Sequence, residues 1–443
     1  MNPNVKMRGS GVEWIGEIPE HWEVRKFSQV ISIQEGQVDP SIEPYKSMIL
    51  IAPNHIESKT GILLYTETAE EQGADSGKYL CREGDVVYSK ISPYLAKVVI
   101  SPCDSLCSGD MYPMRCDQNI LENEFLYWLL LSDSYTRWAV LESMRVVIPR
   151  LNRETMSGYR IPVPPYETQK QIADFLDKET TRIDTLISKK QTQIELLQEK
   201  RQSIITQSVT KGLNPNGKMK DSGVEWIGEI PEHWESIKLK YISTKVNSGK
   251  TPRGGSESYQ DTGVMLIRSQ NVYFDGLRLN DVVFIDKDTD QEMSNSRVLP
   301  RDVLLNITGA SIGRSYYVPQ GFPSSNVNQH VCIIRPNHRK VITEYLWLCM
   351  ASSVIQKIIF SNEKGTSREG ITFEQIKNFD IPLPRTIEEQ SQIAERILSE
   401  IDRNDRTISK IQSSIDLLTE YRSSLITHAV SGQIDITQYE VSK

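Results

Sequence analysis

Two long stretches of the chain carry apolar residues at a seven-residue period. In 167–210 these positions are Ile172, Leu176, Ile183, Ile187, Ile194, Leu197 and Ile204. In 388–431 they are Ile393, Ile397, Ile408, Ile415, Leu418 and Leu425, each 221 residues after its counterpart. Neither stretch contains Pro or Gly. The pattern predicts two long helices with matching coiled-coil seams, each able to extend roughly 60 Å.

One seam position differs between the two stretches. Asn404 stands where the first stretch has Ile183, and a polar residue in a seam can fix helix register at some cost in stability. The matching seams favour an antiparallel pair of helices. The alternative is two amphipathic helices that each cover a separate core.

The segments 24–160 and 236–380 have a different pattern. Short β-prone runs occur at 86–88, 98–100, 303–305 and 331–334, separated by Gly, Pro, Asn and Asp. One helix is expected near 122–141 and another near 342–360. Each segment is therefore predicted to be an α+β globule. A Pro-containing tetrapeptide follows each, at 161–164 and 381–384, where we expect it to stop an incoming strand or loop.

Fourteen residues, SGVEWIGEIPEHWE, occur identically at 10–23 and 222–235. With the two helical stretches, this repeat indicates one module used twice. The predicted domains are 1–160, a first helical spacer 161–213, 214–380, and a second spacer with the C-terminal tail, 381–443. The fold class is α+β, with two pseudo-symmetric domains separated by two long helices that form an antiparallel coiled coil.

The repeated segment contains large aromatic side chains, Trp14 and Trp22 in the first copy and Trp226 and Trp234 in the second. Such residues bury much area when they pack at the start of a globule, and this is the favoured interpretation. Docking of a partner protein is the other, and the two roles can coexist. The exposed faces of the long helices are further docking candidates.

Charge and composition narrow the class of protein. The net charge is −7, yet 236–380 holds 18 Lys/Arg against 14 Asp/Glu, whereas 24–160 holds 14 against 18. The basic second segment keeps nucleic-acid binding open in spite of the acidic total. No run of apolar residues suggests a membrane span or a signal peptide, and the six cysteines share no pattern between the copies. We expect a cytoplasmic protein with reduced thiols.

These elements together resemble the specificity subunit of type I restriction–modification systems. The resemblance rests on SGVEWIGEIPEHW, the segments IPVPP and IPLPR, the E-x-Q-x-Q-I-A helix start, and the helix ends Ser203-Ile-Ile-Thr206 and Ser424-Leu-Ile-Thr427. It covers essentially the whole chain. It implies two target-recognition domains that each read half of a bipartite, asymmetric DNA sequence, with the coiled coil setting the spacer between the halves.

The same resemblance implies the partners. They are double-stranded DNA, two modification subunits that methylate adenine N6 with S-adenosylmethionine, and two ATP-driven restriction subunits. S-adenosylmethionine, ATP and Mg are expected in those partners, and no cofactor is expected in this chain. The target adenine would have to leave the base stack to reach the methyltransferase.

Catalytic motifs are missing at the places where they could occur. Val163 precedes Pro164-Pro165-Tyr166, where an amino-methyltransferase needs Asn, Asp or Ser. Gly249-Lys250-Thr251 lacks the earlier Gly of a phosphate-binding loop, because Thr244 stands there. The His and Cys residues show no metal-ligand spacing. We expect a non-catalytic protein. The alternatives are a coiled-coil adaptor with two protein-binding lobes and, less favoured, a standalone enzyme.

DNA contact needs cations for phosphates, and Arg, Lys, Asn or Gln for base edges. Candidates in the first globule follow the 86–88 run or precede 161–164, and those in the second lie in loops or at strand ends. They are Lys90, Tyr94, Lys97, Arg145, Arg150 and Arg153, and then Arg253, Arg268, Asn271, Arg314, Asn328, Gln329, Lys364 and Arg368. The two glycines of 308–314 would let main-chain N–H groups approach a phosphate.

Overall fold

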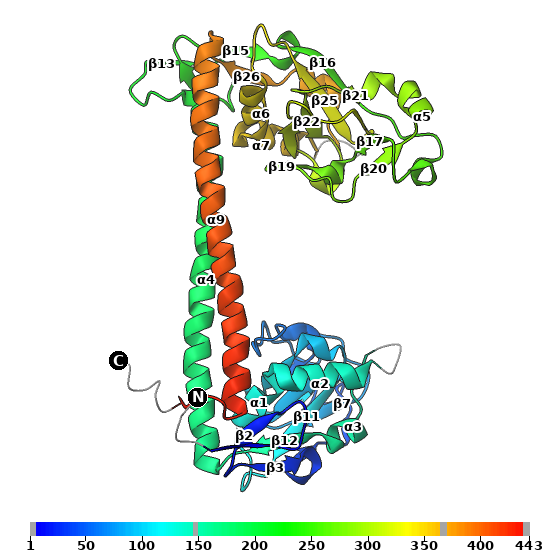
Figure 1. Cartoon of the computed structure of the whole chain (residues 1–443), viewed down its shortest axis with the longest axis vertical. Coiled ribbons are helices and arrows are strands. Elements are labelled where there is room, and N and C mark those ends of the chain that lie inside the picture. Colours follow the sequence, from blue (N-terminus) through cyan, green and yellow to red (C-terminus); the bar gives the residue numbers. More distant parts are fainter. Residues whose placement is uncertain (1–5, 145–148, 364–369, 437–443) are drawn as a thin grey trace. The chain divides into compact units, whose positions relative to one another are not determined.

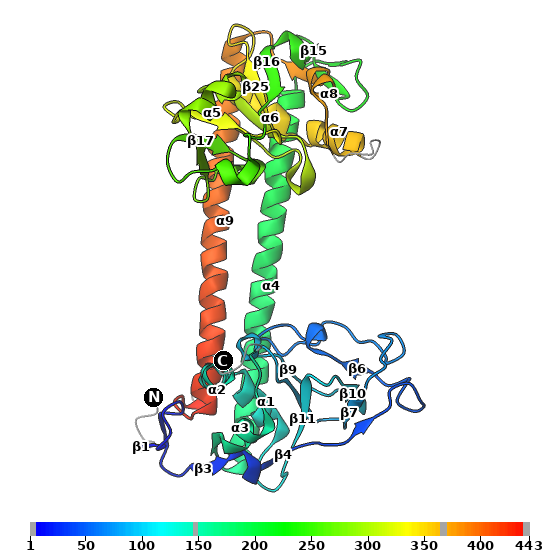
Figure 2. The ribbon, with the colours of Figure 1, turned by 90° about the vertical axis from the view of Figure 1, so that its right-hand side faces the viewer.

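The computed structural model describes residues 6–144, 149–363 and 370–436 and divides the chain into two compact units. Unit 1 comprises Met1–Gln191 and Gln412–Lys443, and unit 2 comprises Thr192–Ile411. Each unit contains one globule and parts of two long helices, α4 (Tyr166–Lys211) and α9 (Ile387–Val430) (Figures 1 and 2). The predicted long helices are thus confirmed. None of the helices in the described part of the chain combines the length and hydropathy that a bilayer span requires.

Two four-stranded sheets form the globule of unit 1. The first is antiparallel, in the order β4 (Ile31–Ile33), β11 (Met111–Cys116), β8 (Val86–Ser89), β9 (Val98–Ile100). The second has the order β5 (Gln37–Val38), β7 (Lys78–Cys81), β10 (Ser105–Cys107), β6 (Leu50–Ile51), with β10 and β6 parallel. Helices α1 (Asn123–Leu131) and α2 (Asp133–Ser143) share the main core with the first sheet.

Unit 2 repeats the first of these sheets strand for strand, and its second sheet shares three strands, including a parallel pair, with that of unit 1. Its first sheet has the order β16 (Ser243–Ser248), β25 (Val331–Pro336), β22 (Val303–Asn306), β23 (Ser315–Tyr317). Its second has the order β20 (Val283–Ile285), β17 (Val264–Ile267), β24 (Ser325–Val327), β21 (Arg297–Val298). Helices α6 (Thr343–Ala351) and α7 (Ser353–Glu363) follow, and a short helix α5 (Lys287–Glu292) is added. The α+β class and all four predicted strands are confirmed.

The single helix expected in each globule is a pair of helices, so that expectation was wrong. Ser132 and Ser352 both adopt an extended conformation, with ψ of 150°, and end the first helix of each pair. The side chains of Ser132 and Ser352 cap the second helix of each pair, and a long helix supplies one further acceptor at its start. Thr427 Oγ1 accepts the N–H of Asp133 at 3.0 Å, and Thr206 Oγ1 accepts the N–H of Ser353 at 2.9 Å. The repeated Thr at the helix ends is therefore a docking residue for α2 and α7.

The Pro-containing tetrapeptides form strands and do not stop them. β12 (Arg160–Val163) pairs with β3 (Glu23–Lys26), and β26 (Asp380–Leu383) pairs with β15 (Glu235–Lys238). Both sheets have only two strands, so each strand is an edge strand and can accommodate Pro162 or Pro382 without losing a required hydrogen bond.

Within each unit, α4 and α9 lie side by side and antiparallel (Figures 1 and 2). In unit 1, Ile172, Leu176, Ile183 and Leu425 are buried in the main core, and Ile187 and Leu418 pack against it. In unit 2, Ile393 and Ile397 are buried with Ile204 packed against them. Ile194 and Ile415 are also buried, whereas Leu197 and Ile408 are half-buried. Asn404 Nδ2 donates to the Leu197 carbonyl at 2.7 Å, so the polar seam residue pairs with the opposite helix.

The repeated segment packs on a helix end in both units. In each copy two short strands form a hairpin, β1 (Met7–Gly9) with β2 (Glu17–Pro19), and β13 (Met219–Asp221) with β14 (Glu229–Pro231). In unit 2 this segment follows α4 directly. In unit 1 it comes from the start of the chain, yet it packs on the end of α9, where a Cβ at Gly432 would stand 2.5 Å from Pro19 Cδ. The same local structure therefore arises from two different connections.

Candidate nucleic-acid interface

In both units the loop that follows the central strand is joined to the segment before a short helix. In unit 1 the loop after β8 forms a bridge between Ile91 and Arg150, and the N–H of Leu151 donates to the Lys90 carbonyl at 2.8 Å. The next helix is α3 (Arg153–Gly158). Two groups of candidates, 60 residues apart in the sequence, are thereby brought together.

Unit 2 makes the same connection with different side chains. Thr308 bridges Gly370, and the N–H of Ile371 donates to the Ile307 carbonyl at 2.9 Å, ahead of α8 (Phe373–Lys377). The backbone of this region is shared by the two units. The side chains that this region presents differ between the two units.

Cations and an aromatic ring gather at this place in unit 1. Lys90 Nζ lies 5.2 Å and the Arg153 guanidinium 5.1 Å from the centre of the Tyr112 ring. Burial raises the pKa of Tyr112, although the Arg153 cation opposes the shift. Arg153 also donates to the carbonyls of Ile33 and Gln34, each at 2.8 Å. Arg153 therefore holds the end of β4, while Arg150 is exposed and Lys90 is half-buried.

The loop between β8 and β9 has an unusual backbone. Ser92 and Ala96 adopt left-handed conformations, with φ of 49° and 43°, on either side of the short 3-10 helix Pro93–Leu95. This conformation leaves Tyr94 55% exposed. Lys97, in contrast, donates to the Pro53 carbonyl and holds the loop to the rest of the globule.

In unit 2 the corresponding place carries arginines around a tyrosine that the sequence did not single out. The guanidinium groups of Arg278 and Arg314 lie 3.7 Å and 4.7 Å from the centre of the Tyr273 ring. Tyr273 belongs to a hairpin of β18 (Val272–Tyr273) and β19 (Gly276–Leu277). Arg314 ends the predicted glycine loop, in which Gly309 and Gly313 have φ of 71° and 84°. Arg278 and Tyr273 show no motif in the sequence, because only the hairpin brings them to Arg314.

The other candidates of unit 2 differ in exposure. Asn271 is buried and donates to the Arg278 carbonyl at 2.8 Å, and Asn328 is buried and accepts the N–H of His330 at 3.1 Å. Both side chains hold loop shape and do not face outward. Arg268 is half-buried, donating to the Asp281 carbonyl at 2.8 Å.

Arg253 and Gln329 are exposed. Arg145, Lys364 and Arg368 lie outside the described residues. In the described part of the chain, no group of three or more His, Cys, Asp or Glu could hold a metal ion.

The four tryptophans divide into two kinds. Trp22 and Trp234 are buried against the helix ends, as the packing interpretation predicts. Trp14 is half-buried, with its ring 5.7 Å from that of Tyr159. Trp226, at the same position of the second copy, is 51% exposed. Only Trp226 therefore offers a large aromatic surface to a partner.

Comparison with known proteins gives consistent similarities. A family model described as the type I restriction modification DNA specificity domain matches residues 19–196 and 231–417. The chain is 33% identical over 215 residues to the type I restriction enzyme EcoDI specificity subunit of Escherichia coli, covering 48% of this chain and 45% of that protein. It is 27% identical over 413 residues to the putative type I restriction enzyme MjaX specificity subunit of Methanocaldococcus jannaschii, covering 88% and 91%.

The fold is similar to a solved structure from work on complex assembly and conformational transition of the type I R-M system. The TM-score is 0.74 with 18% identity, over 94% of this chain and 99% of that one. At this level of identity the likeness concerns the fold alone.

Proposed function

Because the chain belongs to the family of type I restriction modification DNA specificity domains, we propose that it selects the DNA sequence on which a restriction–modification complex acts. Each globule would read one half of a bipartite target, and the chemistry would reside in partner subunits. One observation supports this most directly. Two globules with the same central sheet and helix pair carry different residues at equivalent positions, Lys90 and Arg150 in one and Ile307 and Gly370 in the other. Globules that present different residues to DNA are expected to recognise different sequences. The two half-sites would therefore differ, and the target would be asymmetric.

The chemistry of these loops suits a nucleic acid. Lys and Arg neutralise phosphates, and an arginine beside an aromatic ring presents a planar fork that matches guanine or phosphate. The affinity of such a surface would fall steeply with salt. Those properties support DNA as the ligand over the protein-binding lobes of an adaptor, which the acidic total charge would also allow.

We further propose that the repeated segment binds the same partner twice, namely two modification subunits. Packing accounts for its identical buried residues. It does not account for the identical exposed carboxylates, Glu13 and Glu225, Glu17 and Glu229, and Glu20 and Glu232. A basic surface present on both copies of the same partner protein would account for these identical pairs of carboxylates within the chain. S-adenosylmethionine would belong to these partners, and ATP and Mg to the complete complex with its restriction subunits.

The coiled coil would act as the spacer between the half-sites. Insertion of one heptad into both α4 and α9 adds about 10 Å, or about three base pairs. The preferred gap between methylated half-sites is expected to lengthen accordingly. An unchanged gap would mean that the helices do not set the spacing.

The decisive experiment maps N6-methyladenine across the genome of cells carrying this chain and its cognate modification subunit. Cells carrying the modification subunit alone serve as the control. A split, asymmetric motif that needs this chain supports the proposal and identifies both half-sites. If both proteins are expressed and associated and no motif arises, the adaptor function becomes the better assignment.

A second experiment tests the interface. The pair of substitutions Lys90→Ala and Arg150→Ala should weaken binding to all duplexes and reduce the salt slope by about 2, one for each lost phosphate contact. Lys26→Ala, at an exposed lysine of β3, provides the matched control. An unchanged slope would place the DNA elsewhere on unit 1.

A further inference from the structure

Each long helix carries an arginine that faces an aspartate of the other helix and a turn of a globule. In unit 1, Arg422 Nε of α9 lies 2.9 Å from Asp184 Oδ1 of α4. In unit 2, Arg201 Nε of α4 lies 3.9 Å from Asp405 Oδ1 of α9. The two pairs are equivalent, because both Asp184 and Asp405, and Arg201 and Arg422, are separated by the 221 residues that relate the helices. Neither pair belongs to the apolar seams.

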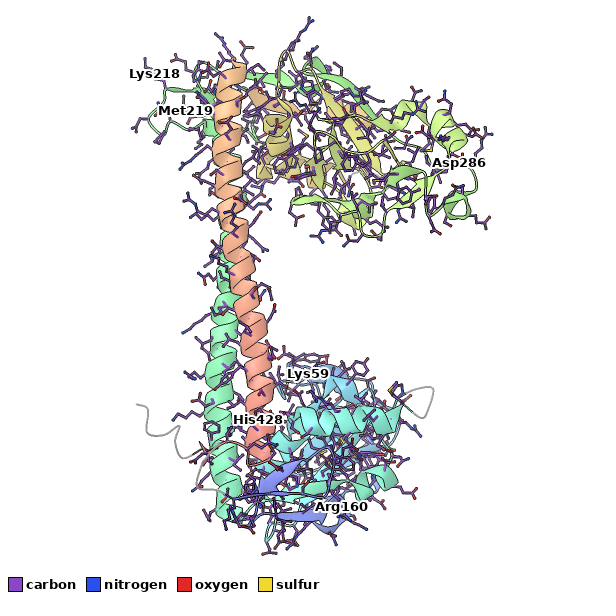
Figure 3. The ribbon with its side chains drawn as sticks, in the orientation of Figure 1. Lys59, Arg160, Lys218, Met219, Asp286 and His428 are labelled. Atoms are coloured by element: carbon purple, nitrogen blue, oxygen red, sulfur yellow. The ribbon has the colours of Figure 1, made fainter. Side chains whose placement is uncertain are left out.

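In unit 1 the free end of the arginine reaches the globule. Arg422 Nη1 donates to the Lys59 carbonyl at 3.1 Å, and Nη2 donates to the Thr60 carbonyl at 3.2 Å. Lys59 is labelled in Figure 3, in the turn 57–62. The turn has a tightly determined shape. Lys59 has a φ of 65°, and a Cβ at Gly61 would stand 1.9 Å from the Tyr127 hydroxyl.

The turn is in direct contact with the proposed DNA-facing loop. The N–H of Lys59 donates to the Leu95 carbonyl at 3.0 Å, next to the exposed Tyr94. A chain of hydrogen bonds therefore runs from Asp184 through Arg422 and the turn to the loop after β8.

Unit 2 has a looser version of this chain. Arg201 Nη2 donates to the Phe274 carbonyl at 3.3 Å, in the hairpin whose Tyr273 contacts Arg314. Arg201 makes one such bond where Arg422 makes two, and its side chain is 19% exposed against 9%. Burial raises the pKa of Asp405, and Asp275 of the same hairpin adds to the shift.

We propose that Arg422 and Arg201 are positioning residues that hold the reading loop of each globule at a set place on the coiled coil. The inference rests on the proposed function in assuming that these loops face DNA. Arg422 makes more hydrogen bonds to its globule than Arg201 does. The half-site read by unit 1 would therefore be held at the more narrowly defined position on the coiled coil.

The test uses Arg422→Gln in the full chain with its modification subunit, with two readouts. The first is amide hydrogen exchange of the turn 57–62 and of 92–97, where about a tenfold faster exchange is expected because two charge-assisted hydrogen bonds are lost. The second is the range of gap lengths in the methylated motif. We expect motifs whose gap is one base pair longer or one base pair shorter to appear beside the original motif, with both half-site sequences unchanged.

The controls separate positioning from simple stabilisation of the coil. Asp184→Asn removes the ion pair but leaves Arg422 able to donate to the turn, so a positioning role predicts a much smaller change in both readouts than Arg422→Gln gives. Arg201→Gln should have the smaller effect. Arg406→Gln removes an exposed pair within α9 and should change nothing.

Unchanged exchange and a single gap in a folded Arg422→Gln chain would overturn the proposal, as would changes of equal size in Asp184→Asn. The exchange measurement does not depend on methylation. If the wild-type chain produces no methylated motif, the proposed function alone is refuted. Faster amide exchange in Arg422→Gln would still support the positioning role of Arg422.

Discussion

The side-chain amide of Gln169 accepts the main-chain N–H of Glu122 at 2.8 Å, across 47 residues of sequence. Its Nε2 donates to the Pro164 carbonyl at 2.8 Å and to the Ile120 carbonyl at 2.9 Å. Gln390 makes the equivalent bonds to Ile342, Lys340 and Pro384 in unit 2. The first glutamine of the E-x-Q-x-Q-I-A motif thus joins the start of each long helix to its globule.

Replacing this glutamine should destabilise its own unit. Gln169→Leu leaves one buried N–H and two buried carbonyls without partners, and we expect a loss of about 3 kcal/mol in the free energy of unfolding of unit 1. Amide exchange followed separately in the two units measures the loss, because two units need not unfold together. Gln171→Leu, at an exposed position of the same motif, should have little effect. Equal losses for both variants would contradict the role.

Ile183 and Asn404 occupy the same position of the two seams, and replacing each by the other residue should change stability to very different extents. Ile183 is 1% exposed, so Ile183→Asn places an amide in an apolar core at a cost of about 3 kcal/mol. Asn404→Ile loses one hydrogen bond and gains apolar burial, so stability should change by no more than about 1 kcal/mol. Denaturant unfolding of both variants tests the contrast. A large loss in Asn404→Ile would mean that its bond to Leu197 stabilises the pair far more than an average hydrogen bond does.

The two helix-end glycines should respond unequally to alanine. Both have left-handed backbones, with φ of 72° at Gly432 and 69° at Gly212. A Cβ at Gly432 meets Pro19 at 2.5 Å and Trp22 at 2.9 Å, whereas at Gly212 the nearest atom, of Trp234, is 3.3 Å away. Gly432→Ala should cost about 3 kcal/mol and Gly212→Ala about 1 kcal/mol. Exchange rates of the repeated segment in each unit report the difference, and the reverse order would be inconsistent with this packing.

Unit 1 should lose stability in mild acid because of one histidine. His55 is 1% exposed, and burial lowers its pKa below the usual 6.5, although Glu67 opposes the shift. The unfolded chain therefore binds a proton more readily than the folded one. Stability is fully present above about pH 6.5 and decreases as the pH falls through the lowered pKa.

The variant His55→Leu should remove this decrease, as measured by unfolding of unit 1 between about pH 5 and 7.5. His338→Leu, at an exposed histidine of unit 2, should leave it in place. If stability still decreases in mild acid in His55→Leu, titratable groups other than His55 cause the decrease.

Periodic and repeated features were readable from the sequence because they depend on local pattern. The seven-residue spacing from Ile172 to Ile204 predicted α4 and its seam, and the runs at 86–88 and 303–305 predicted the central strands β8 and β22. The identical 14-residue segments established that one module is used twice. The resemblance carried by these motifs gave the function class.

Only the tertiary structure decided features that depend on contacts between distant residues. A hydroxyl nearly 300 residues away, of Thr427, accepts the first N–H of α2 and so joins the start of that helix to α9. The burial of Asn271, the meeting of Arg278 with Arg314 around Tyr273, and the reach of Arg422 to Lys59 depend in the same way on where loops meet. A sequence pattern reports the period of an element and its buried face. It does not report which loop lies beside which, because long-range packing and hydrogen bonds determine that arrangement.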